Sequence, residues 1–103
     1  MMYRIMITQK AERDLREIYA YIAETLLSPE NAERQLCRLE TGMMNLRQFP
    51  KRHKIYSDKM WHNKEIRIMP VDNFLIFYIS NDDDKIVTIL RVMYSKRDFP
   101  FEL

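Results

Sequence analysis

The fold of this chain is decided by residues 65–98, which read EIRIMPVDNFLIFYISNDDDKIVTILRVMYSKRD. Three runs rich in apolar residues predict three successive strands, and the turn-forming residues at 72–73 and 81–84 separate them. The second and third runs are apolar at nearly every position, which is typical of strands that lie inside a sheet and are covered on both faces. A basic, tyrosine-containing segment ends the stretch, so we expect an apolar sheet with cationic residues at its rim.

Two amphipathic helices precede these strands. Thr8 has the side chain of an N-cap, and an apolar stripe at helical spacing follows it over residues 9–26. Ser28-Pro29 predicts a stop and a restart, with a second helix over residues 29–48 that the following Phe-Pro pair ends. The short connection predicts an antiparallel helical hairpin. The two stripes are Ala11, Leu15, Ile18, Ile22 and Leu26, and then Ala32, Leu36, Leu39, Met43 and Leu46.

A short strand over residues 3–7 completes the pattern of elements. The order strand, helix, helix and three strands predicts an α+β fold (β-α-α-β-β-β), with the antiparallel helical hairpin packed on one face of a mainly antiparallel sheet. We expect the other face, or part of it, to form a shallow open surface bordered by Arg67 and the C-terminal basic residues. The length of 103 residues, with no linker or repeat, predicts a single domain over 1–103.

Composition restricts the class of protein. With 47% hydrophobic and 31% charged residues, the chain is typical of a soluble globular domain and not of a disordered one. No apolar run is long enough to span a membrane, and no export signal is recognisable at the N-terminus. The lone Cys37 cannot form an internal disulfide, which favours a cytoplasmic location. No cofactor is implied, and His53 and His62 have no neighbours at ligand spacing, so no metal site is predicted.

The charge of the chain is unevenly distributed. Its net charge is only +2, yet residues 51–67 hold six Lys and Arg against two Asp and Glu. Further basic residues lie near the C-terminus. A basic patch beside a neutral half favours an anionic partner, with nucleic acid first among the candidates. The alternative is a solvated loop whose charge has no partner.

Several short motifs follow one another along almost the whole chain. They are Ala11-x-x-Asp14-Leu15-x-x-Ile18-x-x-Tyr21-Ile22, Ser28-Pro29-x-x-Ala32, Leu46-x-x-Phe49-Pro50, Ile66-Arg67-x-x-x-Val71-x-Asn73-Phe74-Leu75-Ile76-Phe77-Tyr78 and Ile89-Leu90-Arg91-Val92-Met93-Tyr94-Ser95-Lys96-Arg97-Asp98. In this order and at this length, the chain resembles the RelE/ParE superfamily of bacterial toxins from type II toxin–antitoxin modules. The long helical hairpin and the final Arg-Val-x-x-x-x-Arg-Asp are more similar to the ParE, or plasmid stabilisation, side.

The resemblance implies a toxin with one of two targets. RelE-type members act on the ribosome as mRNA endonucleases (mRNA interferases), whereas ParE-type members inhibit DNA gyrase by binding and without catalysis. Both are held inactive by a cognate antitoxin. Fold alone does not choose between them. The sequence favours the ribosome-dependent endonuclease slightly, with gyrase inhibition as the alternative and a partner protein without toxicity as a third hypothesis.

The resemblance also implies residues for RNA cleavage. In metal-independent cleavage the 2′-OH attacks the phosphate, which requires a proton acceptor, positive charge at the phosphate and a proton donor. Arg67 matches the strand arginine that holds the phosphate in the family, Arg97 is placed to join it, and Tyr94 lies where the catalytic Tyr or His is found. Glu65, which alternation places on the Arg67 face, is the candidate base. Contacts to nucleic acid are predicted for Lys54, Lys59, Lys64, Arg91 and Lys96.

Each of these residues also has a structural interpretation. Arg67 can be a salt-bridge residue with Glu65 as its partner, Tyr94 can be a packing aromatic, and Arg97 can pair locally with Asp98. A tyrosine with a pKa near ~10 is a poor acid or base at neutral pH unless its surroundings shift that pKa. A toxin that acts by binding needs no catalytic set, and its basic residues would then contact the partner.

Overall fold

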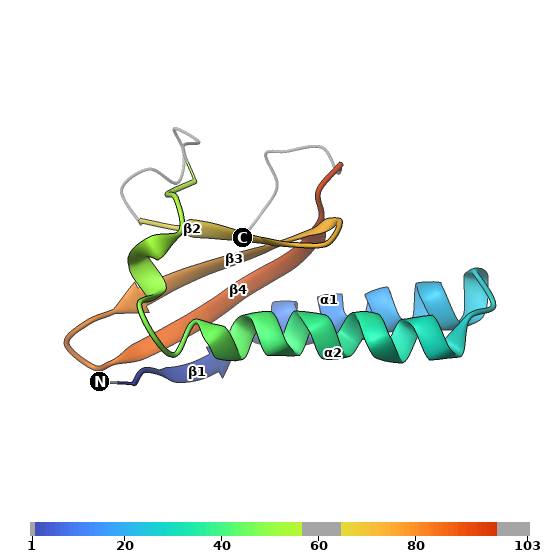
Figure 1. Cartoon of the computed structure of the whole chain (residues 1–103), viewed down its shortest axis with the longest axis horizontal. Helices are drawn as coiled ribbons and strands as arrows, with labels where there is room; N and C mark the ends of the chain where they lie inside the picture. Colours follow the sequence, from blue (N-terminus) through green and yellow to red (C-terminus); the bar gives the residue numbers. More distant parts are fainter. Residues whose placement is uncertain (1, 57–64, 97–103) are drawn as a thin grey trace.

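The computed structural model describes residues 2–56 and 65–96 (Figure 1). The predicted order of one strand, two helices and three strands is confirmed, with two short helical turns added. In chain order the elements are β1 (Arg4–Ile7), α1 (Gln9–Ala20), the π-helical turn η1 (Tyr21–Thr25), α2 (Pro29–Asn45), the 3-10 turn η2 (Pro50–Arg52), β2 (Arg67–Val71), β3 (Phe74–Asn81) and β4 (Ile86–Tyr94).

The strands form one mixed sheet in the order β1-β4-β3-β2. β2, β3 and β4 are antiparallel neighbours, whereas β1 pairs in parallel with β4. β1 reaches this place because the helical hairpin carries the chain across the sheet between the first strand and the rest. The sheet is therefore mainly antiparallel, as predicted, and β3 and β4 are its central strands.

The helical hairpin covers one face of the sheet (Figure 1). Alternate residues of the central strands pack against α1 and α2 because successive side chains in a strand point to opposite faces. The buried core on this face consists of Ala11, Leu15, Leu39, Met43, Leu46, Met69, Ile76, Tyr78, Val87, Ile89 and Val92.

The opposite face carries a smaller apolar cluster. Phe77, Met93 and Ile66 are buried there, and the Tyr56 ring lies edge-on to Phe77 with 5.4 Å between the ring centroids. The expectation that Arg67 borders this face is wrong. Arg67 alternates in phase with Met69, which lies in the core beneath the helices, so Arg67 projects from the helix-covered face.

The first helix begins where the sequence predicts. The Thr8 hydroxyl accepts a hydrogen bond from the Ala11 amide (3.1 Å) and donates one to the Leu90 carbonyl (3.0 Å), which ties the cap to β4. The predicted helix over 9–26 is correct to Ala20, after which the backbone widens into the π-turn η1. This turn lies beyond the ends of the strands in Figure 1, so Leu26 has no sheet beneath it and is 54% exposed.

The second helix is shorter than predicted. Ser28 occupies the N-cap position, but its side chain makes no capping hydrogen bond, and the helix ends at Asn45 instead of residue 48. Gly42, the only glycine of the chain, lies where α2 passes close to β2. A Cβ atom at this position would lie 2.9 Å from Cγ2 of Val71, so the absence of a side chain permits the close approach.

Candidate functional site

Arg67 holds the chain that follows α2. Its Nη1 donates to the carbonyls of Lys51 (3.2 Å) and His53 (2.7 Å), and its side chain is partly buried. Buried or half-buried carbonyls need donors, and a guanidinium supplies several in a fixed geometry. The partners are therefore backbone carbonyls and not the Glu65 carboxylate, which sequence reasoning offered as the structural alternative.

Two further side chains hold the same segment. The buried Tyr78 hydroxyl donates to the Pro50 carbonyl, and the Arg52 guanidinium donates to the carbonyl of Asn45 at the end of α2 and to those of Gln48 and Phe49 after it. Burial raises the pKa of Tyr78 to about 12, although the charges of Arg67 and Arg52 act in the opposite direction. We call Arg52, Arg67 and Tyr78 the carbonyl clamp.

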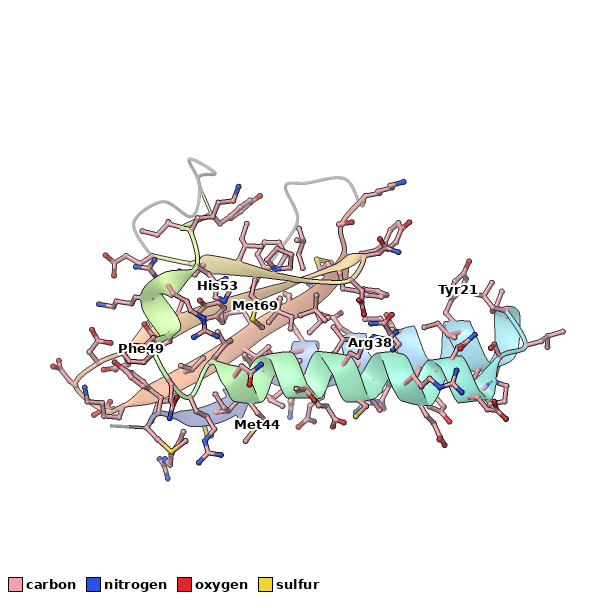
Figure 2. All side chains as sticks on the ribbon, in the orientation of Figure 1. Tyr21, Arg38, Met44, Phe49, His53 and Met69 are labelled. Atoms are coloured by element: carbon pink, nitrogen blue, oxygen red, sulfur yellow. The ribbon has the colours of Figure 1, made fainter. Side chains whose placement is uncertain are left out.

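The carbonyl clamp fixes an exposed aromatic residue. Phe49 has a left-handed backbone (φ 50°, ψ 54°) and is 79% exposed. A non-glycine residue in this region costs about 1–3 kcal/mol and persists only where its surroundings determine it. Figure 2 shows Phe49 in the loop after α2, at the end of the molecule opposite Tyr21. Sequence reasoning used Phe49 as a helix terminator and as part of a family motif, and the Phe-Pro pair alone gave no signal for its exposure.

Arg91 lies in a buried ion pair. Its Nε and Nη2 donate to the Asp14 carboxylate at 2.7 and 2.9 Å, and the Val92 amide donates to the same carboxylate at 2.9 Å. The side chains of Arg91 and Asp14 are only 15% and 7% exposed. The carboxylate thus satisfies an arginine and a strand amide together, which joins α1 to β4. This arrangement gives Arg91 a structural role beside its predicted contact to nucleic acid.

Tyr94 lies far from Arg67. Tyr94 pairs with Phe74 in the sheet, whereas Arg67 pairs with Tyr78 on the other side of β3. Four residues along a strand span about 13 Å, and Arg67 is bonded to the carbonyls of Lys51 and His53 instead of pointing along the strand to Tyr94. Tyr94 is 45% exposed and packs against the Phe74 ring, with 5.9 Å between the centroids.

The other predicted residues are dispersed. Glu65 is exposed, has a left-handed backbone (φ 50°) and precedes β2, so it does not share a strand face with Arg67 as the alternation predicted. Lys54 and Lys96 are exposed at opposite ends of the sheet, the first beside Ile68 and the second in the turn after β4. Lys59, Lys64 and Arg97 lie outside the described residues. No group of three or more His, Cys, Asp or Glu placed to hold a metal ion occurs within residues 2–56 and 65–96.

A groove that sequence reasoning missed lies beside Tyr94. It has a volume of about 640 Å³ and runs between the distal half of the hairpin and the adjoining strand ends. It exists because the helical stripe continues beyond the sheet through Ile22 and Leu26. The stripe was visible in the sequence, but the place where the sheet ends beneath it was not. The lining residues are Asp14, Glu17, Ile18, Tyr21, Ile22, Leu26, Gln35, Asn73, Phe74, Val92, Met93 and Tyr94.

A second, smaller pocket of about 390 Å³ lies at the other end of the molecule, beside Phe49. Asp82 accepts a hydrogen bond from the Tyr3 hydroxyl (2.8 Å) and pairs with the Lys51 ammonium (2.5 Å). These contacts lower the pKa of Asp82 and raise the pKa values of Lys51 and Tyr3. The Lys85 ammonium lies 5.1 Å from the centroid of the Tyr3 ring, so two cations border the pocket.

Solved toxin structures share this fold. The chain superposes on the chromosomal ParDE toxin–antitoxin system of P. aeruginosa with a TM-score of 0.75 and 21% identity, covering 92% of this chain and 98% of that one. For the Mycobacterium tuberculosis toxin–antitoxin complex RelBE2 the TM-score is 0.67 at 22% identity, with 90% and 91% covered. For a mutant of the E. coli toxin RelE in the free state it is 0.58 at 14% identity, with 93% and 86% covered. The architecture is therefore that of the RelE/ParE toxins.

The sequence assigns the chain within that class. Residues 5–99 match the family described as the ParE toxin of the type II toxin–antitoxin system, parDE, and the chain belongs to this family. A comparison with curated proteins finds no match. The resemblance drawn from the motifs is confirmed, and the chain is the toxin of a type II toxin–antitoxin system.

Proposed function

We propose that this toxin acts by binding its target and not by cleaving RNA, and that the target is DNA gyrase. The observation that carries this proposal is the arrangement of Arg67, Arg91 and Tyr94. The two guanidinium groups bond to backbone carbonyls and to a buried carboxylate, and Tyr94 is offset from Arg67 by four residues along the sheet. Membership of the ParE family favours the same alternative.

RNA cleavage makes a geometric demand that these residues do not meet. The 2′-OH, the phosphate and the leaving oxygen lie within a few ångströms of one another, so the base, the cation and the acid must converge to hydrogen-bond distances of about 3 Å. Here Arg67 and Tyr94 are separated by about 13 Å along the sheet, and Glu65 is in a turn outside β2. A toxin that works by surface contact needs no such convergence.

Expression of the chain alone in cells tests the proposal, with mRNA 5′ ends and plasmid supercoiling measured in the same culture. We expect altered plasmid topology with intact mRNA, and the same result for Tyr94→Phe, which keeps the ring on Phe74. New 5′ ends inside translated frames that disappear in Tyr94→Phe would contradict the proposal. Arg67→Ala is not a suitable probe because it also removes the carbonyl clamp.

We further propose that a cognate antitoxin fills the groove beside Tyr94 with an apolar helix face. Comparable structures are toxin–antitoxin complexes. The groove carries exposed apolar residues, among them Tyr21 (57% exposed) and Leu26 (54% exposed). An amphipathic helix that docks in a groove buries residues of this kind at helical spacing. The antitoxin would cover the groove when the toxin is held inactive.

A pair of adjacent leucines tests this placement. Leu26→Asp puts a charge into the groove, and we expect antitoxin affinity to fall at least tenfold with little change in toxin stability, because Leu26 is half exposed. Leu27→Asp is the matched control, since Leu27 is 82% exposed and does not line the groove. Equal affinities for both variants in a titration with the purified antitoxin would exclude the groove.

A cytoplasmic location belongs to the same proposal, because both partners are intracellular. The single Cys37 is exposed on α2 as a free thiol, which suits a reducing compartment. In the described part of the chain, the helices are too short or too polar to cross a membrane.

A further inference from the structure

The pocket beside Phe49 lies at the other end of the molecule from the groove beside Tyr94 (Figure 2). It is lined by Tyr3, Gln48, Phe49, Pro50, Lys51 and Lys85, all from the described part of the chain. Its volume of about 390 Å³ lies within the range of small-ligand sites, which is about 300–1,000 Å³. Its walls combine an exposed aromatic ring with two ammonium groups.

The backbone of Phe49 is held in place by surrounding contacts that keep this residue exposed. Phe49 keeps a left-handed backbone although proline follows it, and the carbonyl clamp fixes the chain on both sides of it. A strained backbone that its surroundings keep in place occurs often at binding sites. An exposed phenyl ring offers a flat apolar face at which a second flat ring can stack.

The two lysines keep donors for an anion. Lys51 is paired with Asp82, but an ammonium has three donors and a single carboxylate uses one or two of them. Lys85 faces the Tyr3 ring through a cation–π contact at 5.1 Å, which orients the ammonium without using its hydrogen-bond donors on an acceptor. Asp82 is already ion-paired with Lys51 and accepts a hydrogen bond from the Tyr3 hydroxyl, and the charge of Glu65 acts more weakly on Lys51.

We propose that this pocket binds a nucleotide unit, with the base stacked on Phe49 and the phosphate bound by Lys51 and Lys85. An aromatic face beside cations is the arrangement by which proteins bind unpaired nucleotides, because stacking accepts any base and the cations take the phosphate. The unit can belong to a single strand or to a free nucleotide. This site does not depend on gyrase being the target, since it needs no second protein.

Binding of short fluorescent oligothymidylate and oligouridylate to the purified chain tests the site, with adenosine monophosphate titrated separately by calorimetry. No gyrase or ribosome is present, so the result is independent of the proposed function. We expect Phe49→Gly to weaken binding about tenfold or more, which is the size of one lost stacking contact. We also expect its melting temperature not to fall, because glycine prefers the left-handed backbone found there.

The chain offers a matched control in Leu27→Gly. Leu27 has a similar backbone (φ 54°) and a similar exposure of 82%, and it lies at the other end of the hairpin. We expect Leu27→Gly to bind as the unaltered chain does. Lys85→Gln should weaken binding and reduce the slope of log affinity against log salt by roughly 0.7, the value for one phosphate contact on a single strand.

The outcomes separate the possible ligands. If only the oligonucleotides bind, the site takes a single strand. If adenosine monophosphate binds as well, the site takes a nucleotide unit from either source. Either result supports the proposal when Phe49→Gly abolishes the binding. Equal binding by Phe49→Gly and the unaltered chain would overturn it. So would failure of all three probes, or binding of polyglutamate in their place, which would assign the surface to an acidic protein.

Discussion

The Asp14 carboxylate joins α1 to β4. It accepts hydrogen bonds from Arg91 and from the Val92 amide while it is almost fully buried. Removal of one member of a buried pair leaves the other charge without its partner, which typically costs about 3–5 kcal/mol. Asp14→Ala should therefore lower the free energy of unfolding in urea by about 3 kcal/mol, whereas the exposed Glu17→Ala should change it little.

A double-mutant cycle with Arg91→Met measures the interaction energy between Asp14 and Arg91. If the pair is the reason for the loss, Asp14→Ala and Arg91→Met together should cost clearly less than the sum of the single changes. Simple additivity would mean that Asp14 and Arg91 act independently and that the ion pair is not the reason for the loss.

Tyr78 gives the protein a distinct response to alkaline pH. Its pKa is raised from 10.0 to about 12 because burial disfavours the phenolate. A raised pKa means that the folded state favours the protonated form, so this contribution to stability is complete below pH 10 and is lost as the pH rises toward about 12. Stability measured in urea across this window should fall more steeply for the unaltered chain than for Tyr78→Phe, which cannot ionise. Parallel curves would show that Tyr78 ionises as it does in the unfolded chain.

At the scale of residues, the sequence predicted what depends on neighbours along the chain. The Thr8 cap follows from local spacing and is present. The partners of Arg67 could not be predicted, because its acceptors are carbonyls of a segment at least 14 residues earlier that only the tertiary fold brings near. The exposure of Phe49 depends on the same contacts.

Among the elements, α2 packs closely against β2 because Gly42 has no side chain. Gly42→Ala would gain helix propensity of up to about 1 kcal/mol, but the new Cβ would meet Val71 at 2.9 Å. Overpacking of this kind costs about 1–3 kcal/mol, and the branched Val71 has little freedom to move. We expect a net loss of up to about 2 kcal/mol in chemical unfolding.

The neighbouring Thr41 supplies the comparison. Thr41 is exposed on the same helix, so Thr41→Ala should be neutral or slightly stabilising through propensity alone. If Gly42→Ala is as stable as Thr41→Ala, Val71 moves to make room for the new methyl group, and Gly42 does not fix the position of the helix.

Element types were predictable, but the positions of elements relative to one another were less so. Periodicity of four and three residues predicted both helices, and the apolar runs predicted β3 and β4. The sequence could not show where the sheet ends beneath the hairpin, so Ile22 and Leu26 were taken for core and instead line a groove. The sequence placed Arg67 at the border of the open face because it gave no sign of η2, whose Lys51 carbonyl accepts a hydrogen bond from Arg67 on the helix-covered face.

At the scale of the whole molecule, two surfaces lie at opposite ends of the helical hairpin. One is the apolar groove beside Tyr21 and Tyr94, and the other is the cationic pocket beside Phe49 (Figure 2). Their separation predicts that a partner in the groove leaves the pocket accessible. A toxin saturated with antitoxin should therefore still bind oligonucleotide, with an affinity like that of the free toxin, and loss of that binding would show that the two surfaces overlap.

Purified components distinguish a toxin that works by binding from one that cleaves RNA. The chain would be added to DNA gyrase in a supercoiling assay and, separately, to ribosomes programmed with mRNA. We predict loss of supercoiling in the first assay and intact mRNA in the second, because Arg67, Arg91 and Tyr94 do not converge on one phosphate. Full gyrase activity together with cleaved mRNA would exclude action by binding alone and restore the nuclease hypothesis.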